Sequence, residues 1–148
     1  RIVVVGKDNT VDQKFRRELK RLVRVFLLED KFLWLDWIDD TSELFAALDI
    51  LVSASHTESF GMAILEAMTC GTIVIATETE GAKELIRDRE LLVPIRDPVA
   101  LAKAICDILA DPKRAERLAN SAREYACSNF SLGKMIGGVE ALYRSLLN

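Results

Sequence analysis

Two glutamates, Glu58 and Glu66, are the side chains of this sequence best suited to binding a ligand or taking part in a reaction. Residues 60–70 are expected to form a helix that is apolar on nearly every side, and such a helix is normally buried. Glu66 has no cationic neighbour three or four residues away, and a buried carboxylate without a partner is costly. We expect Glu66 either to accept hydrogen bonds from ligand hydroxyls, or to make a structural hydrogen bond to the next loop or a distant arginine.

The start of the same helix has the features of an anion site. The amides of Ser59, Phe60, Gly61 and Met62 form an open helix N-terminus, where glycine allows close approach and the helix dipole favours a phosphate. Glu58, just before this turn, fits if a diphosphate lies over the amides while the carboxylate faces the neutral hydroxyls of a sugar attached to it. The alternative for Glu58 is the ordinary preference for acidic residues near a helix N-terminus.

The elements that must position these residues follow from hydrophobic periodicity. Short β-branched apolar runs alternate with longer amphipathic stretches, which is typical of a parallel sheet covered by helices. Strands are predicted at 2–5, 32–37, 50–53, 72–76 and 91–93, and helices at 11–28, 42–48, 60–70 and 82–87. Three C-terminal helices follow, capped by Asp97, Asp111 and Ser131. We predict one doubly wound α/β domain over residues 1–148, which binds ligands at the carboxyl ends of its strands.

Composition excludes several other classes of protein. With 148 residues, of which 50% are hydrophobic and 29% charged, the chain is neither disordered nor of low complexity. A net charge of −3 without a block of like charges argues against a nucleic-acid partner. The three cysteines and one histidine have no zinc or disulfide spacing, and no apolar run approaches the roughly 18 residues of a membrane span. We therefore expect a cytoplasmic protein.

A longer string of residues extends the two-glutamate pattern. Ser55-x-x-Glu58-x-Phe60-Gly61-x-x-x-Leu65-Glu66-Ala67-Met68-x-x-Gly71-x-x-Val74 resembles the corresponding string of retaining glycosyltransferases of the GT-B fold, in glycosyltransferase family 4 or group 1. Gly81-x-x-Glu84-Leu85-Ile86, Leu92-Val93-Pro94-x-x-Asp97-Pro98 and Asn129-Phe130-Ser131 are similar to family segments at similar spacing. The resemblance covers nearly the whole chain.

The resemblance implies a Rossmann-like half of a GT-B fold and a role for each matching residue. Glu58 corresponds to the residue that contacts the donor sugar and is the expected catalytic residue, and Glu66 to the one that holds the ribose hydroxyls. The backbone of residues 60–62 matches the diphosphate-binding segment. The segment at Trp37 and Ile38 corresponds to the part near the nucleobase. Gly6 matches a glycine at the edge of the same cleft.

The implied reaction is transfer of a hexose from a nucleoside diphosphate sugar to a glycan or lipid-linked acceptor, with retention of anomeric configuration. We expect no metal cofactor, because Asp39 and Asp40 are adjacent rather than spaced as Asp-x-Asp. The resemblance also implies a separate acceptor domain and a cationic phosphate clamp upstream of Arg1, so this chain alone is expected to be inactive. His56 is not expected to be catalytic. The full enzyme is expected to associate peripherally with a membrane.

Some positions depart from the family pattern, and two other functions are weighed against it. Asp36 and Glu80 stand where glycine is usual, and both add negative charge if they face the donor; Ala54, Ser59 and Ile73 also depart. The alternatives are a non-catalytic signalling domain, such as a response-regulator receiver, and a sugar-nucleotide epimerase or phosphorylase of similar fold. A receiver needs acidic residues where this chain has Lys7-Asp8 and Ser53-Ala54, and a lysine where it has Pro94.

Overall fold

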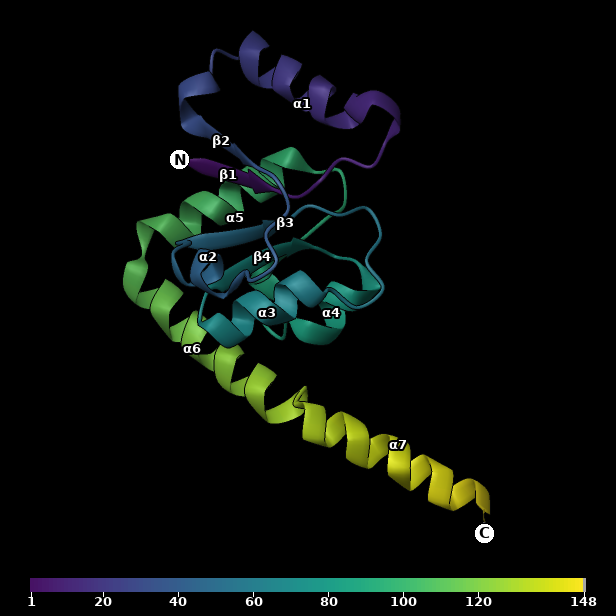
Figure 1. Cartoon of the computed structure of the whole chain (residues 1–148). Helices are drawn as coiled ribbons and strands as arrows, with labels where there is room; N and C mark the ends of the chain where they lie inside the picture. Colours follow the sequence, from purple (N-terminus) through teal and green to yellow (C-terminus); the bar gives the residue numbers. More distant parts are fainter. Residues whose placement is uncertain (148) are drawn as a thin grey trace. The chain divides into compact units, whose positions relative to one another are not determined.

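The computed structural model describes residues 1–147 and has the predicted α/β fold, in which neighbouring strands run parallel (Figure 1). The chain divides into two compact units, unit 1 (Arg1–Thr41) and unit 2 (Ser42–Asn148). The organisation as a single domain stays a prediction. Within the described residues, no helix combines the length and the apolar character needed to cross a bilayer.

Unit 1 is a parallel strand pair with one long helix. Its elements are β1 (Ile2–Val5), a 3-10 turn (Val11–Gln13), α1 (Lys14–Val25), a second 3-10 turn (Glu29–Lys31) and β2 (Phe32–Leu35). β1 pairs with β2 from Ile2 opposite Phe32 to Val5 opposite Leu35. The helix predicted from Val11 begins at Lys14, because Asp12 and Gln13 have left-handed φ values of 55° and 52°.

The strand predicted to reach Trp37 ends at Leu35, so this prediction was wrong at its end. Trp34 lies on the strand and is half-buried, with the Arg16 guanidinium 5.7 Å and the Lys20 ammonium 5.5 Å from its ring centroid. Trp37 lies after the strand and is 65% exposed. Because only Trp34 lies on the strand, the alternation of side chains along a strand does not set the relative orientation of the two tryptophans.

Asp8 caps α1 from the loop that follows β1. Its carboxylate accepts hydrogen bonds from the Thr10 hydroxyl at 2.6 Å, the Thr10 amide at 2.9 Å and the Arg16 amide at 2.7 Å. These donors favour the ionised form, so they lower the pKa of Asp8 below its ordinary value, with the Thr10 hydroxyl contributing most. The stabilisation from this carboxylate is complete above the ordinary aspartate pKa and is lost as pH falls through the lowered one.

Replacing Thr10 by valine tests this cap. We expect Thr10→Val to raise the pKa of Asp8 toward its ordinary value, because the hydroxyl donor is removed. The measurement is an NMR titration of the Asp8 side-chain carboxyl carbon in both chains. Thr57→Val, at an exposed threonine of unit 2, is the control and leaves the titration unchanged. An equal Asp8 pKa in the Thr10→Val and unaltered chains contradicts the assignment.

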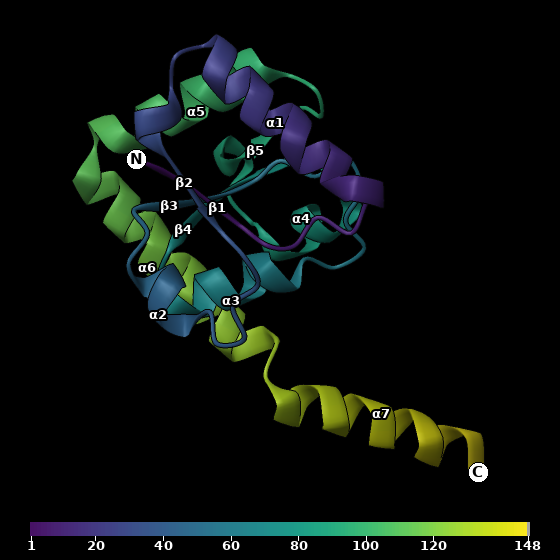
Figure 2. The same ribbon diagram turned by 45° about the horizontal axis from the view of Figure 1, so that its top comes forward.

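Unit 2 contains the larger sheet and the main core. Its elements are α2 (Ser42–Ala46), β3 (Ile50–Ser53), α3 (Met62–Cys70), β4 (Ile73–Thr77), α4 (Glu80–Leu85), a 3-10 turn (Arg89–Leu91), β5 (Leu92–Val93), α5 (Pro98–Ala110), α6 (Pro112–Asn129) and α7 (Leu132–Leu147). β4 lies between β3 and β5 and is buried along its whole length. α3 packs against α6 and β4 (Figure 2). The largest fully buried side chains are those of Ile64, Met68, Ile75 and Leu85.

The three C-terminal helices and their caps are confirmed. The Asp97 carboxylate accepts from the amides of Val99 and Ala100, and the Asp111 carboxylate accepts from the amide of Arg114. The Ser131 hydroxyl accepts from the Lys134 amide at 3.3 Å.

Every residue of α7 that the structure describes is exposed, and α7 extends away from α6 (Figure 1). A Cβ added at residue 137 or 138, both glycines, would meet no atom within 4 Å, so no close packing requires glycine there.

Candidate functional site

The loop between β3 and α3 carries Glu58 and ends in a turn that requires glycine. α3 begins at Met62 rather than at the predicted Phe60, because Gly61 has a left-handed φ of 96°. A Cβ on Gly61 would also lie 3.0 Å from the Ile64 side chain and 3.4 Å from Cγ of Glu58. The turn therefore brings the half-buried Glu58 against the first turn of α3.

The N-terminus of α3 differs from those of the helices that follow it. Its N-cap, Gly61, has no side chain, so no side-chain oxygen of the N-cap satisfies the first-turn amides. In α4, α5 and α6 the N-cap side chains of Thr79, Asp97 and Asp111 accept from such amides. The helix N-terminus predicted near Phe60 therefore lies two residues later, with Gly61 as N-cap and Met62 as the first helical residue, and no N-cap side chain covers it. Ser59 is exposed in the preceding turn.

Phe60 anchors this turn to α6. Its ring packs edge-on against that of Phe130, with centroids 5.8 Å apart, and Phe130 packs in the same way against Tyr125 at 5.6 Å. Phe130 belongs to the Asn129-Phe130-Ser131 segment that resembles the family. The Phe60 side chain therefore has a packing role, while its backbone forms part of the turn.

The end of β4 and the start of α4 hold the same loop by hydrogen bonds to its backbone. The Thr77 hydroxyl donates to the backbone oxygen of Ser55 at 2.5 Å, and the Gly81 amide donates to the backbone oxygen of Glu58 at 3.0 Å. Sequence reasoning assigned no role to Thr77 or Gly81. Gly81 could have been singled out because it belongs to a segment that resembles the family. Nothing near Thr77 in the sequence indicates its role, because its hydrogen-bond partner Ser55 is distant along the chain.

The prediction that α3 is buried on nearly every side was wrong. Met62 is 58% exposed, Ala63 is exposed and Glu66 is half-buried. The buried face carries Ile64 and the residues 67–68, and α6, α2 and β4 pack against α3 without covering Met62 and Ala63. Glu66 is therefore less desolvated than a carboxylate in a fully buried helix. Glu66 lies one turn after Met62, so both belong to the more open face that continues from the helix N-terminus.

Unit 1 contains the three other predicted site residues. Gly6 has a φ of 128°, and its backbone oxygen accepts from the Arg16 guanidinium at 3.1 Å. The exposed Trp37 donates its indole N–H to the Asp39 carboxylate at 2.7 Å, and Ile38 is half-buried. A role for Gly6, Trp37 and Ile38 near a nucleobase stays a prediction.

Both acidic residues at usual glycine positions have a cationic partner within their own unit. Asp36 accepts from the Arg16 guanidinium at 2.9 Å, and Arg16 also donates to the backbone oxygen of Leu35 at 3.2 Å. Glu80 pairs with the Lys83 ammonium at 2.6 Å. Each added negative charge is therefore offset locally by a cation.

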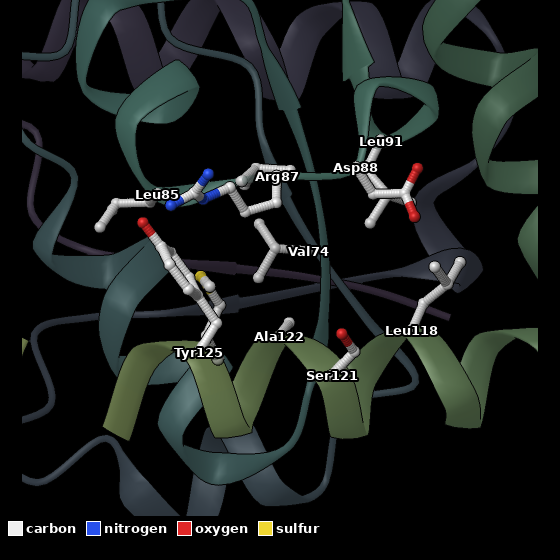
Figure 3. Close-up of a pocket in the computed structure, with 11 residues that line it drawn as sticks. Val74, Leu85, Arg87, Asp88, Leu91, Leu118, Ser121, Ala122 and Tyr125 are labelled. Atoms are coloured by element: carbon white, nitrogen blue, oxygen red, sulfur yellow. The ribbon is translucent and has the colours of Figure 1, made fainter. Parts of the chain in front are cut away.

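A cavity of about 520 Å³ in unit 2 lies apart from the predicted residues (Figure 3). It opens between α6 and the segment that follows α4, over an apolar floor that includes Val74 and Leu85. Arg87 and Tyr125 lie together on one side of it, with the guanidinium 4.5 Å from the ring centroid. No predicted site residue lines this cavity. Across residues 1–147, no three His, Cys, Asp or Glu side chains are grouped to hold a metal ion.

The chain is similar to known glycosyltransferases in sequence and in fold. The model of the family described as "Glycosyl transferases group 1" matches residues 1–125. N-acetyl-alpha-D-glucosaminyl L-malate synthase of Bacillus anthracis is 32% identical over 129 residues, which cover 86% of this chain and 34% of that protein. Sucrose-phosphate synthase from Thermosynechococcus elongatus superposes with a TM-score of 0.87 at 34% identity, over 98% of this chain and 37% of that one.

A third similar structure is Anabaena Alr3699/HepE in complex with UDP. It has a TM-score of 0.92 and 27% identity, over 97% of this chain and 40% of that one. The same protein has also been solved in complex with UDP-glucose. The chain spans well under half of the length of each of these proteins.

The parallel α/β architecture is that of the Rossmann-like part of a GT-B glycosyltransferase. The chain belongs to the glycosyl transferases group 1 family. Membership of this family favours the glycosyltransferase prediction over the signalling-domain and epimerase alternatives.

Proposed function

We propose that this chain binds the donor in a retaining glycosyltransferase, which transfers a hexose from a nucleoside diphosphate sugar to a hydroxyl of a glycan or lipid-linked acceptor. The observation that carries the proposal is the α3 N-terminus, which has no side-chain cap and has Glu58 in the turn that leads into it. Family membership and the complexes of a similar protein with UDP and UDP-glucose support it. The acceptor, membrane association of the whole enzyme and a cytoplasmic location stay predictions.

In this proposal the amides of residues 59–62 bind the donor diphosphate. The positive end of the α3 dipole attracts the phosphates, and fixed backbone donors stabilise the negative charge that builds up as the diphosphate leaves. Such donors are already oriented by the turn at Gly61, so little reorganisation accompanies the reaction. The chain thus contributes orientation of the donor and stabilisation of the leaving group.

The two glutamates then bind neutral hydroxyls rather than phosphates. Glu58 contacts hydroxyls of the donor sugar and is the proposed catalytic residue, because it lies beside the turn that binds the diphosphate to which the sugar is attached. Glu66 accepts hydrogen bonds from the ribose hydroxyls, from the more open face of α3. A carboxylate is a strong acceptor for such hydroxyls.

We further propose that donor binding to this chain requires no divalent cation, because backbone amides and a helix dipole bind the diphosphate. Calorimetric titration with UDP, GDP and ADP tests both proposals. We expect one of these diphosphates to bind much more tightly than its parent nucleoside. We expect its dissociation constant to be the same in EDTA and in magnesium. Absence of binding by every diphosphate contradicts donor binding. Loss of binding in EDTA that magnesium restores contradicts metal independence alone.

A further inference from the structure

We propose that Gly81, supported by Thr77, is a positioning residue that sets the place of the Glu58–Gly61 turn for the donor diphosphate. This inference rests on the proposed function of that turn. Gly81 is the second residue of α4, and Thr77 is the last residue of β4. Both are buried, and neither belongs to the segment that would touch the donor.

Gly81 is required by close approach rather than by backbone conformation. Its φ is not in the left-handed region, and it lies within a helix, where alanine is the better helix former. A Cβ at this position, however, would lie 2.6 Å from both the carbonyl carbon and the oxygen of Phe60 and 2.7 Å from its Cα. These are backbone atoms, so no side-chain rotation could relieve the overlap.

A hydrogen bond acts at the same place. The Gly81 amide donates to the backbone oxygen of Glu58 at 3.0 Å. The missing side chain lets α4 approach Phe60, and the hydrogen bond holds the backbone of Glu58 to α4. Gly81 therefore contacts the backbone of the turn at two places, Glu58 and Phe60. This turn leads directly into α3.

The segment that carries Gly81 is itself firmly held. The Thr79 side chain caps α4 by accepting from the Ala82 amide at 3.3 Å, and Ala82 and Leu85 are buried in the core. The Thr77 hydroxyl donates to the backbone oxygen of Ser55 at 2.5 Å and to that of Ser53 at 3.3 Å. The central strand β4 is thus linked to the start of the loop through Thr77, and α4 is linked to Glu58 through Gly81.

Replacing Gly81 by alanine is expected to move the turn. Bringing the Cβ from 2.6 Å to the 3.4 Å of ordinary contact requires a displacement approaching 1 Å. We expect the partly exposed turn to yield rather than α4, because α4 is held through its buried residues Gly81, Ala82 and Leu85. Misplacement on this scale is enough to weaken a preorganised interaction strongly. We expect Gly81→Ala to weaken UDP binding by about tenfold and to leave uridine binding unchanged, since uridine has no phosphates.

The experiment compares the unaltered chain with Gly81→Ala, Thr77→Val and the control Gly137→Ala. Gly137 is an exposed glycine in α7 with nothing within 4 Å of its Cβ position. Titrations with UDP and uridine are combined with amide NMR spectra of the chains without ligand. We expect shifts concentrated at residues 58–62 and a selective loss of UDP affinity in Gly81→Ala, a smaller loss in Thr77→Val, and neither in Gly137→Ala.

The outcomes separate the inference from the proposed function. If the unaltered chain binds no nucleoside diphosphate, the proposed function fails, while the ligand-free spectra still report whether Gly81 positions the turn. If it binds UDP and Gly81→Ala binds it equally well, or loses UDP and uridine by the same factor, the positioning role is overturned. If Gly81→Ala does not fold, Thr77→Val decides the outcome. Unchanged UDP binding by Thr77→Val then overturns the proposal that Gly81 and Thr77 position the Glu58–Gly61 turn.

Discussion

UDP binds about tenfold to a hundredfold more weakly to Glu66→Gln than to the unaltered chain, if Glu66 accepts hydrogen bonds from the ribose. Hydrogen bonds to a charged group are worth about 1.5–3 kcal/mol, and glutamine keeps the shape of the side chain while removing the charge. The effect is expected to vanish for 2′,3′-dideoxyuridine diphosphate, which lacks both ribose hydroxyls. Calorimetric titration with the two ligands measures the difference.

Glu116→Gln is the matched control for this prediction. Glu116 is an exposed glutamate near the start of α6, so its neutralisation changes the net charge equally and leaves UDP affinity unchanged. We expect the free energy of unfolding of Glu66→Gln to change by less than the about 3–5 kcal/mol of a broken buried ion pair, because Glu66 is only half-buried. Equal weakening of both ligands, together with strong destabilisation, would make Glu66 a structural residue.

Ile75→Ala is expected to lower the free energy of unfolding of unit 2 by about 2–5 kcal/mol. Ile75 lies at the middle of β4, opposite Val52 of β3, and its side chain is fully buried in the core. The truncation removes apolar contacts and leaves a cavity that the flanking strands cannot close without breaking their pairing. Urea denaturation followed by circular dichroism measures the change.

Two variants calibrate this result. Ile75→Val removes a single methylene and is expected to cost about 0.5–1.5 kcal/mol. Val99→Ala, at a 77% exposed position near the start of α5, is expected to change stability by no more than about 0.5 kcal/mol. A cost for Ile75→Ala as small as that for Val99→Ala would contradict the placement of β4 at the centre of the core.

Features that depend on neighbouring residues follow from the amino-acid sequence alone. The helix starts at Asp97, Asp111 and Ser131 were predicted correctly, because each cap is a hydrogen bond to an amide two or three residues away. The strands at 2–5 and 50–53 were also predicted with their observed bounds, because their apolar runs end at polar or glycine residues. The ordered string of residues from Ser55 to Val74 was sufficient to indicate the family.

The packing of the folded chain sets which faces are covered and which segments meet. The composition of α3 does not say which of its residues α2, α6 and β4 leave uncovered, so Met62 and Glu66 are more exposed than their apolar neighbours predicted. The approach of Gly81 to Phe60 joins segments that are distant along the chain, and nothing in the sequence near either residue encodes the distance. Hydrogen bonds between near neighbours are encoded locally, whereas burial and close approach depend on how the helices pack around the sheet.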